Sequence, residues 1–332
     1  MENRIYNFNP GPAMQPLEVL QEAQAEFLNF AKSGMSIIEI SHRSKQYEQV
    51  HNQAKADIKE LMGLGDDYEV LFCQGGASMQ FTMIPQNFAV DGKVGNYVLS
   101  GSFATKAYDE AKLLNRGFVA ASSKDRDFKH IPTQDEIKLS DNAAYLHLCY
   151  NNTIYGTEYH YIPETGDVPL IADMSSDMLS RPLDFSKFSL IYAGAQKNLG
   201  PAGVVVVVAR KSFLENSPKE VPTMLRYDTY LKKNSLYNTP PAFGILICGT
   251  GIGMSIVANK FKGIMCAKVD NSDEARLAKE HNHANVISFS AKKTMWEIKD
   301  IVDAYLRSEY LEDERYLRRI EEIEKIEKLR KY

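Results

Sequence analysis

One lysine stands between two apolar runs in this chain. The run Leu190–Ala193 leads through small residues to Lys197, and a Gly/Pro turn and five consecutive valines follow it. Such runs are typical of strands that are buried on both faces of a parallel or mixed α/β sheet. An ammonium group beside the end of a buried strand is costly unless it is paired or consumed by chemistry. A lysine that snorkels out of a loop is the commoner alternative, so Lys197 alone does not decide a function.

A carboxylate at the end of a second apolar run complements this lysine. The run Val168–Ala172 ends in Asp173, 24 positions before Lys197. That distance allows a neighbouring strand, so we expect both residues at the carboxyl ends of strands, where open α/β sheets bind ligands. A lysine amine can form a Schiff base with pyridoxal phosphate (PLP), and a carboxylate can hold the proton on its pyridine nitrogen. The pair predicts a PLP site, with an ordinary turn aspartate as the alternative.

Length and composition exclude several classes of protein. At 332 residues the chain is long enough for two domains, and 44% hydrophobic with 25% charged residues is ordinary for a soluble globular protein. A net charge of −4 with mixed signs predicts no nucleic-acid partner. No signal peptide and no apolar run of about 20 residues is apparent, so we expect a cytoplasmic enzyme without a membrane partner. The four cysteines form no CxxC motif, which argues against a metal site or a disulfide framework.

Two strand-to-helix turns provide candidate cofactor contacts. The apolar run Tyr68–Cys73 leads through two glycines to Ala77 and Ser78 and then to a helical pattern. Small residues at a helix start let backbone N–H groups close on a phosphate, although the turn is neither a GxGxxG nor a Walker A motif. Phe103 begins another helix and could stack on a cofactor ring, while most aromatic residues simply pack in the core.

Two further turns carry polar candidates. Thr153 follows the run Tyr145–Cys149 and could hydrogen-bond the phenolic oxygen of the cofactor, or merely form a turn. His42 and Arg43 follow a short apolar run and could border a cleft that receives an anion. A solvated basic turn is at least as frequent for such a pair.

Taken together, these stretches resemble the phosphoserine aminotransferase family from about residue 6 to residue 243. The ordered matches are Gly11-Pro12-Ala13-Met14, Glu39-Ile-Ser-His42-Arg43, Gly75-Gly76-Ala77-Ser78, Asn152-Thr153-Ile, Ala172-Asp173-Met-Ser-Ser, Tyr192-Ala-Gly-Ala-Gln196-Lys197-Asn-Leu-Gly-Pro-Ala-Gly203 and Tyr237-Asn238-Thr239-Pro240-Pro241. The resemblance implies the large domain of PLP fold type I, a mixed, mostly parallel seven-stranded sheet with helices on both faces. It also implies transamination of O-phospho-L-serine with 2-oxoglutarate in serine biosynthesis.

The resemblance implies a role for each cofactor contact. Lys197 would form the internal aldimine and shuttle the proton between the substrate Cα and C4′ of PLP, and Asp173 would pair with the pyridine nitrogen. Thr153 and Gln196 would hold the side of the ring oxygen. Phe103 would stack on the ring at a position that is usually tryptophan in the family.

The resemblance also implies contacts to phosphate groups and to the substrate. Ala77 and Ser78 would bind the cofactor phosphate, and Asn238 and Thr239 would bind the cofactor phosphate of the neighbouring subunit. His42 and Arg43 would bind the anionic substrate. A phosphate held across two subunits implies a homodimer with shared active sites. The implied substrates are small molecules, phosphoserine and the glutamate/2-oxoglutarate pair.

After residue 243 the chain resembles a different family, the type B ribose-5-phosphate isomerases, in their second half (about 244–330). The segment Gly244–Lys260 contains a strand, a glycine loop and the start of a helix. The resemblance implies that Cys248 is the base that moves a proton between C1 and C2, that Thr250 lies in the loop that steadies the enediolate, and that His281 opens the sugar ring. Arg315 and Arg319 would bind the phosphate. A buried strand cysteine and a surface histidine are the ordinary alternatives.

The sequence therefore predicts a fusion of an aminotransferase large domain (1–243) with a partial Rossmann-like α/β segment and a C-terminal helix (244–332). Each piece lacks part of its usual site: the first lacks the C-terminal domain with a carboxylate-binding arginine, and the second lacks its first half. We favour transamination. The alternatives are isomerisation of ribose 5-phosphate through Cys248, and a PLP-binding fusion without effective turnover.

Overall fold

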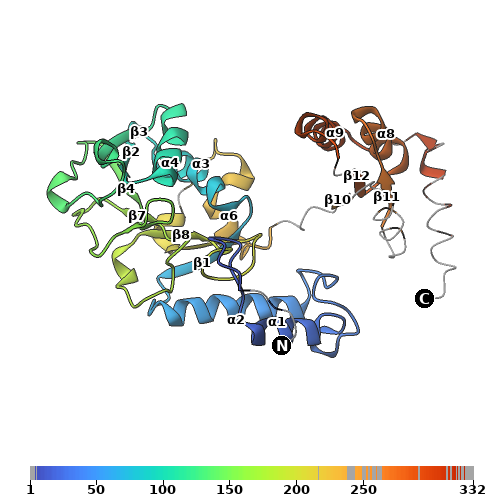
Figure 1. The fold of residues 1–332 in the computed structure, drawn as a ribbon, viewed down its shortest axis with the longest axis horizontal. Helices are drawn as coiled ribbons and strands as arrows, with labels where there is room; N and C mark the ends of the chain where they lie inside the picture. Colours follow the sequence, from blue (N-terminus) through green and yellow to red (C-terminus); the bar gives the residue numbers. More distant parts are fainter. Residues whose placement is uncertain are drawn as a thin grey trace. The chain divides into compact units, whose positions relative to one another are not determined.

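The computed structural model describes residues 4, 6–215, 217–237, 244–248, 252, 255, 259, 264–290, 292–311, 313, 314, 316–318, 320, 322 and 325, with 244–248 and 295 described by their backbone alone. The chain divides into two compact units, Met1–Asn238 and Thr239–Tyr332 (Figure 1). The division lies near the predicted join between residues 243 and 244. The assignment of the two units to an aminotransferase domain and an isomerase-like segment stays a prediction.

A seven-stranded sheet with the order β1-β9-β8-β7-β4-β2-β3 forms the centre of the first unit. Its strands are β1 (Tyr68–Cys73), β2 (Val94–Leu99), β3 (Gly117–Ser122), β4 (Ala143–Cys149), β7 (Leu170–Asp173), β8 (Leu190–Gly194) and β9 (Val205–Arg210). The strands β8, β7, β4, β2 and β3 run parallel to one another, and β9 is antiparallel to both β8 and β1. The predicted mixed, mostly parallel sheet is confirmed. A separate hairpin, β5 (Asn151–Asn152) and β6 (Thr157–Glu158), follows β4.

Helices precede, connect and follow these strands. The α-helices of this unit are α1 (Leu17–Glu26), α2 (Lys45–Leu61), α3 (Gly76–Phe88), α4 (Ser102–Leu113), α5 (Lys211–Leu214) and α6 (Tyr227–Lys232). The 3-10 turns are η1 (Phe30–Lys32), η2 (Lys124–Arg126), η3 (Gln134–Glu136), η4 (Phe185–Lys187) and η5 (Thr223–Leu225). Ser44 caps α2, because its side chain accepts a hydrogen bond from the Tyr47 backbone N–H.

Apolar side chains cover both faces of the sheet. Leu146, Ile191 and Val206 belong to the cluster on one face of the sheet. This face is covered by residues between β4 and β8 and by the end of α2. Tyr145 and Tyr192 belong to the cluster on the other face, where α3 and α4 lie side by side (Figure 1). Every residue of β8 is buried, as are the valines of β9, so the prediction that these runs are strands buried on both faces is confirmed.

The second unit contains a fully parallel sheet of three strands in the order β10-β12-β11. Its described elements are β10 (Gly244–Cys248), β11 (Cys266–Lys268), α8 (Ser272–Asn282), β12 (Val286–Ser290) and α9 (Met295–Arg307). A small core that includes Ile287, Phe289, Ile301 and Tyr305 joins the sheet to the two helices.

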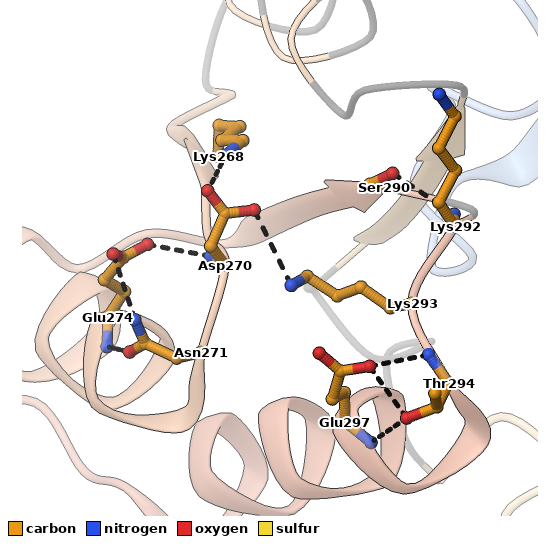
Figure 2. A network of polar contacts seen from close by, with 9 residues as sticks. All are labelled: Lys268, Asp270, Asn271, Glu274, Ser290, Lys292, Lys293, Thr294 and Glu297. Atoms are coloured by element: carbon orange, nitrogen blue, oxygen red, sulfur yellow. Dashed lines mark hydrogen bonds and ion pairs between the residues drawn. The ribbon is translucent and has the colours of Figure 1, made fainter.

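A polar network ties the carboxyl ends of β11 and β12 together (Figure 2). Asp270, just after β11, forms ion pairs with Lys268 and, at 3.7 Å, with Lys293 after β12. A capping box also begins α9: the Thr294 backbone N–H donates to Glu297 at 2.7 Å, and the Glu297 N–H donates to the Thr294 hydroxyl at 3.3 Å. Among the described helices of both units, none has the length and apolar character that crossing a bilayer requires.

Candidate active site

Lys197 lies in the turn that follows β8, and two other segments meet its amine. The Nζ atom donates a hydrogen bond of 2.9 Å to the Thr153 hydroxyl, in the turn between β5 and β6. The same nitrogen lies 4.8 Å from the centroid of the Phe103 ring, in the first turn of α4. Three predicted residues from separate parts of the chain therefore surround one amine, which a cation–π contact and a hydrogen bond hold in place.

The N-terminal segment packs closely over this lysine. The Ala13 backbone N–H donates to the carbonyl of Gln196 at 2.8 Å. Gly11 has a φ of +135°, and a Cβ atom there would lie 2.9 Å from Cγ of Lys197. Only glycine tolerates both the conformation and the approach. Sequence reasoning gave no role to Gly11, although its place in the Gly-Pro-Ala-Met motif was a usable signal. The proposed ring-oxygen role of the Gln196 side chain stays a prediction.

Asp173 is the last residue of β7 and has only 4% of its surface exposed. The Ser175 backbone N–H and hydroxyl donate to its Oδ1 at 3.0 and 2.7 Å. The Ser175 hydroxyl also accepts from the Gly194 N–H at 3.0 Å, which ties the carboxylate to β8. Burial raises the pKa of Asp173, while the Ser175 hydrogen bonds and the Lys197 charge act in the opposite direction. Sequence reasoning did not predict that Ser175 donates to Asp173. The small polar residues after Asp173 were the only sequence signal for these hydrogen bonds.

The start of α3 has the form of the predicted phosphate cup. Gly75 and Gly76 have φ values of 82° and 66°, and no side chain caps the helix. Ala77 and Ser78 lie in the first turn, where backbone N–H groups lack partners within the helix. The ring of Phe81, one turn further, packs edge-on against Tyr192 of β8 with centroids 6.3 Å apart. The helix thus lies against the strand that leads to Lys197, and its phosphate-binding role stays a prediction.

The predicted substrate residues His42 and Arg43 lie just before α2. His42 has 7% of its surface exposed, and its Nε2 has no hydrogen-bond partner among the described residues. Arg43 is exposed. Within the described part of the chain no hydrogen bond or ion pair joins either side chain to Lys197, so their role in binding the substrate stays a prediction.

The remaining predicted site residues are described in part or not at all. Asn238, Thr239, Thr250, Arg315 and Arg319 lie outside the described residues. Cys248 is described by its backbone, as the last residue of β10, opposite Ser290 of β12. His281 is half-buried in α8, and its ring stacks on Tyr316 with centroids 4.3 Å apart. The isomerase set therefore stays a prediction.

Comparisons with known proteins place the chain in a family. The family Aminotransferase class-V matches residues 5–305. The chain belongs to the class-V aminotransferases. A phosphoserine aminotransferase from Niallia circulans is 59% identical over 245 residues, which are 74% of this chain and 68% of the relative. The identity to phosphoserine aminotransferases supports PLP-dependent transamination in serine biosynthesis.

Solved structures agree with this assignment. The phosphoserine aminotransferase from Bacillus circulans subsp. alkalophilus has a TM-score of 0.70 at 59% identity, and the match covers 72% of this chain and 66% of that one. A PLP-bound phosphoserine aminotransferase from Trichomonas vaginalis has a TM-score of 0.67 at 41% identity, and the match covers 72% of this chain and 71% of that one. The chain thus spans about two thirds of the length of these relatives. The fold is that of PLP fold type I aminotransferases, and PLP is the cofactor of the family.

The comparisons do not confirm a fusion. A type B ribose 5-phosphate isomerase from Trypanosoma cruzi is 38% identical, but its match covers 27% of this chain with a TM-score of 0.26. The class-V aminotransferase match continues past residue 243 to residue 305.

The residues around Lys197 fit PLP. The cofactor needs an amine for its aldehyde, a carboxylate for its pyridine nitrogen, an aromatic face and N–H groups for its phosphate. Lys197, Asp173 and Phe103 would supply the first three, and the uncapped start of α3 would supply the fourth.

A second buried acid lies four residues after Asp173. Asp177 has 7% of its surface exposed, and its Oδ1 has no hydrogen-bond partner among the described residues. Burial raises its pKa to about 7, and the charges of Glu158 and Asp173 act in the same direction. Because the folded pKa lies above the unfolded value of 3.8, the contribution of this group to stability is fully present below about pH 4 and is lost as the pH rises from there through about 7.

We expect Asp177→Asn to remove this pH dependence, because asparagine resembles the protonated acid in shape. The variant and the wild type should melt at similar temperatures below about pH 4, where Asp177 is protonated in both the folded and the unfolded chain. At pH 8 the variant should be the more stable by at most about 4 kcal/mol, the equivalent of three pKa units. Calorimetry of both proteins across this range measures the difference, and a gap that does not grow with pH would contradict the assignment.

Proposed function

We propose that this chain catalyses PLP-dependent transamination of O-phospho-L-serine with 2-oxoglutarate. The observation that carries the proposal is the position of the Lys197 amine, 2.9 Å from the Thr153 hydroxyl and 4.8 Å from the centroid of Phe103. Membership of the class-V aminotransferases and 59% identity to a phosphoserine aminotransferase support it.

Bound PLP supplies an electron sink for the carbanion that forms when the substrate loses its Cα proton. In this proposal the Lys197 amine holds PLP and later carries that proton, as a general base and acid. The Thr153 hydroxyl and the Phe103 ring keep the amine in place. Asp173 holds a proton on the pyridine nitrogen, and Gln196 contacts the ring-oxygen side. Ala77 and Ser78 bind the phosphate at the start of α3, and His42 and Arg43 bind the anionic substrate.

A binder without effective turnover is the alternative. The residues proposed to touch PLP lie before residue 244, whereas the chain spans only about two thirds of the length of its relatives. Substrate orientation and exclusion of water depend on parts that close over a site. Adding glutamate to the PLP-loaded protein separates the two outcomes, because only a transaminase converts the visible absorption band to that of the amine form of the cofactor.

We expect Lys197→Ala to abolish covalent PLP attachment and to lower turnover by at least about 100-fold, because no other group takes over the proton transfer. Borohydride reduction of the PLP-loaded wild type, followed by peptide mapping, should place the label on Lys197. Lys187→Ala is the matched control, since Lys187 is an exposed lysine of η4. A label on another lysine of the wild type would contradict the proposed role.

We further propose that the chain forms a cytoplasmic homodimer with shared active sites. Large apolar side chains near the N-terminus are exposed to water in the single chain, among them Phe8 at 91% and Leu28 at 81%. Exposed apolar surface of this kind favours association. Free thiols at Cys73, Cys149 and Cys266 fit a reducing compartment.

Complementation tests the shared site, because Lys197 and Thr239 would act from different subunits. Lys197→Ala and Thr239→Ala should each be nearly inactive alone. After unfolding and refolding together, random pairing restores one intact site in half of the dimers, which is roughly a quarter of the wild-type activity. A mixture that stays inactive, although light scattering shows dimers, would argue against sharing.

A second candidate function belongs to the C-terminal unit. We propose that Cys248 can act as the base of an aldose–ketose isomerase on ribose 5-phosphate, a reaction in which Thr250, His281, Arg315 and Arg319 would assist. The observation in its favour is that Cys248 ends a strand of a fully parallel sheet, at the edge where such sheets bind ligands.

We expect Cys248→Ala to lower any ribose 5-phosphate isomerisation by about 100-fold or more, because the proton between C1 and C2 loses its carrier. Cys266→Ala is the matched control, since Cys266 begins β11 at the opposite end of the same sheet. An isomerisation rate that Cys248→Ala leaves unchanged would remove this function.

A further inference from the structure

A histidine and a tyrosine lie behind the buried carboxylate of the candidate site. Tyr192 of β8 is paired in register with Asp173 of β7, and the Tyr192 side chain acts to lower the pKa of Asp173. The Tyr192 hydroxyl lies 2.9 Å from Nε2 of His147 in β4. The exposed fractions of the Tyr192 and His147 side chains are 0% and 1%, so water does not compete for the bond between them. The reaction proposed above uses neither side chain.

The protonation states of His147 and Tyr192 indicate which group donates and which accepts. Burial lowers the pKa of His147 to about 3, so its ring is neutral and carries one proton. Burial raises the pKa of Tyr192 well above its ordinary value, so its hydroxyl keeps its proton. Among the described residues His147 Nδ1 has no hydrogen-bond partner. If Tyr192 gives its proton to the carboxylate, its oxygen must accept from His147, which places the ring proton on Nε2.

Few ionisable groups besides Tyr192 and His147 lie near Asp173 and could balance its charge. The ionisable side chains around these three residues are Lys197, Cys149, Asp177, Tyr97 and Tyr227. Burial raises the pKa of the Cys149 thiol and of both tyrosines, which stay neutral. Asp177 disfavours a second negative charge nearby. Lys197 is thus the cationic neighbour, and in the proposed reaction its amine is occupied with the cofactor.

We propose that Tyr192 and His147 are positioning residues that donate in series, His147 to Tyr192 and Tyr192 to Asp173, and so keep Asp173 ionised and aimed at the pyridine nitrogen. This inference rests on the proposed PLP function. Neutral donors stabilise the carboxylate without adding a cation that would compete with the protonated ring. Ser175 supplies the other donors to Asp173, from the N–H and hydroxyl of a separate turn.

The test compares variants of the full chain after loading with PLP. Tyr192→Phe keeps the ring and removes the donor. Its matched control is Tyr145→Phe, because the Tyr145 hydroxyl is equally buried and bonds Tyr97 at 2.7 Å, two residues before His147 on the same strand. His147→Gln retains a donor near the position of Nε2, whereas His147→Leu has none. The readouts are the dissociation constant for PLP and the pH titration of the visible absorption band.

We expect Tyr192→Phe and His147→Leu to raise the apparent pKa of the visible band by about one unit and to weaken PLP binding about tenfold. A less firmly held ring proton makes the linkage between lysine and cofactor more basic, so its own proton leaves at higher pH. Tyr145→Phe and His147→Gln should titrate like the wild type.

Each other result counts against the inference. Equal shifts in Tyr192→Phe and Tyr145→Phe would show that any lost buried hydroxyl has this effect. If Tyr192→Phe fails to fold, the two His147 variants decide, and identical titrations would overturn the series of donors. A wild type without a PLP band would reject the proposed function itself, whereas a normal wild-type band with unshifted variants would reject only this inference.

Discussion

Burial of a negative charge at one edge of the sheet is the constraint on which the rest of the site depends. Asp173 has 4% of its surface exposed, so the protein must replace the water that would solvate its carboxylate. The N–H and hydroxyl of Ser175, in the turn after β7, do this, and the lysine charge assists. These groups meet because β4, β7 and β8 are adjacent parallel strands whose carboxyl ends share one edge.

The amine of Lys197 is held as firmly as the carboxylate. A hydroxyl from the β5–β6 hairpin and an aromatic face from α4 approach the amine, and the glycine of the N-terminal segment packs against the stem of the same side chain. Such an arrangement reduces the number of positions that the lysine side chain can adopt before the cofactor binds. Preorganisation of this kind lowers the entropic cost of reaching a reactive geometry.

The two units differ in the size of their sheets and in the functional groups that they bring together. The first unit has a complete sheet, both apolar clusters and a set of groups that fits PLP. The second unit has a three-stranded parallel sheet with its own core, and a cysteine that ends one strand. Family membership extends to residue 305, whereas the relative from Niallia circulans aligns over 245 residues. Activity measured on the full chain will therefore show what the second unit contributes.

The sequence by itself determined the strands, the lysine and the carboxylate. The runs that became β8 and β9 are apolar throughout, because strands buried on both faces tolerate no polar alternation, and Lys197 and Asp173 stand directly after such runs. Motifs with small residues also indicated the turn at Gly75 and Gly76, since positive φ angles favour glycine.

Only the tertiary structure decided which side chains meet. His147 and Tyr192 are 45 residues apart and are unremarkable members of apolar runs, yet strand order and register place them in series behind Asp173. The approach of Gly11 to Lys197 likewise depends on a contact across most of the unit. Local sequence encodes periodicity and turn chemistry, whereas contacts of this kind depend on how strands pair and helices pack, which no short window of sequence contains.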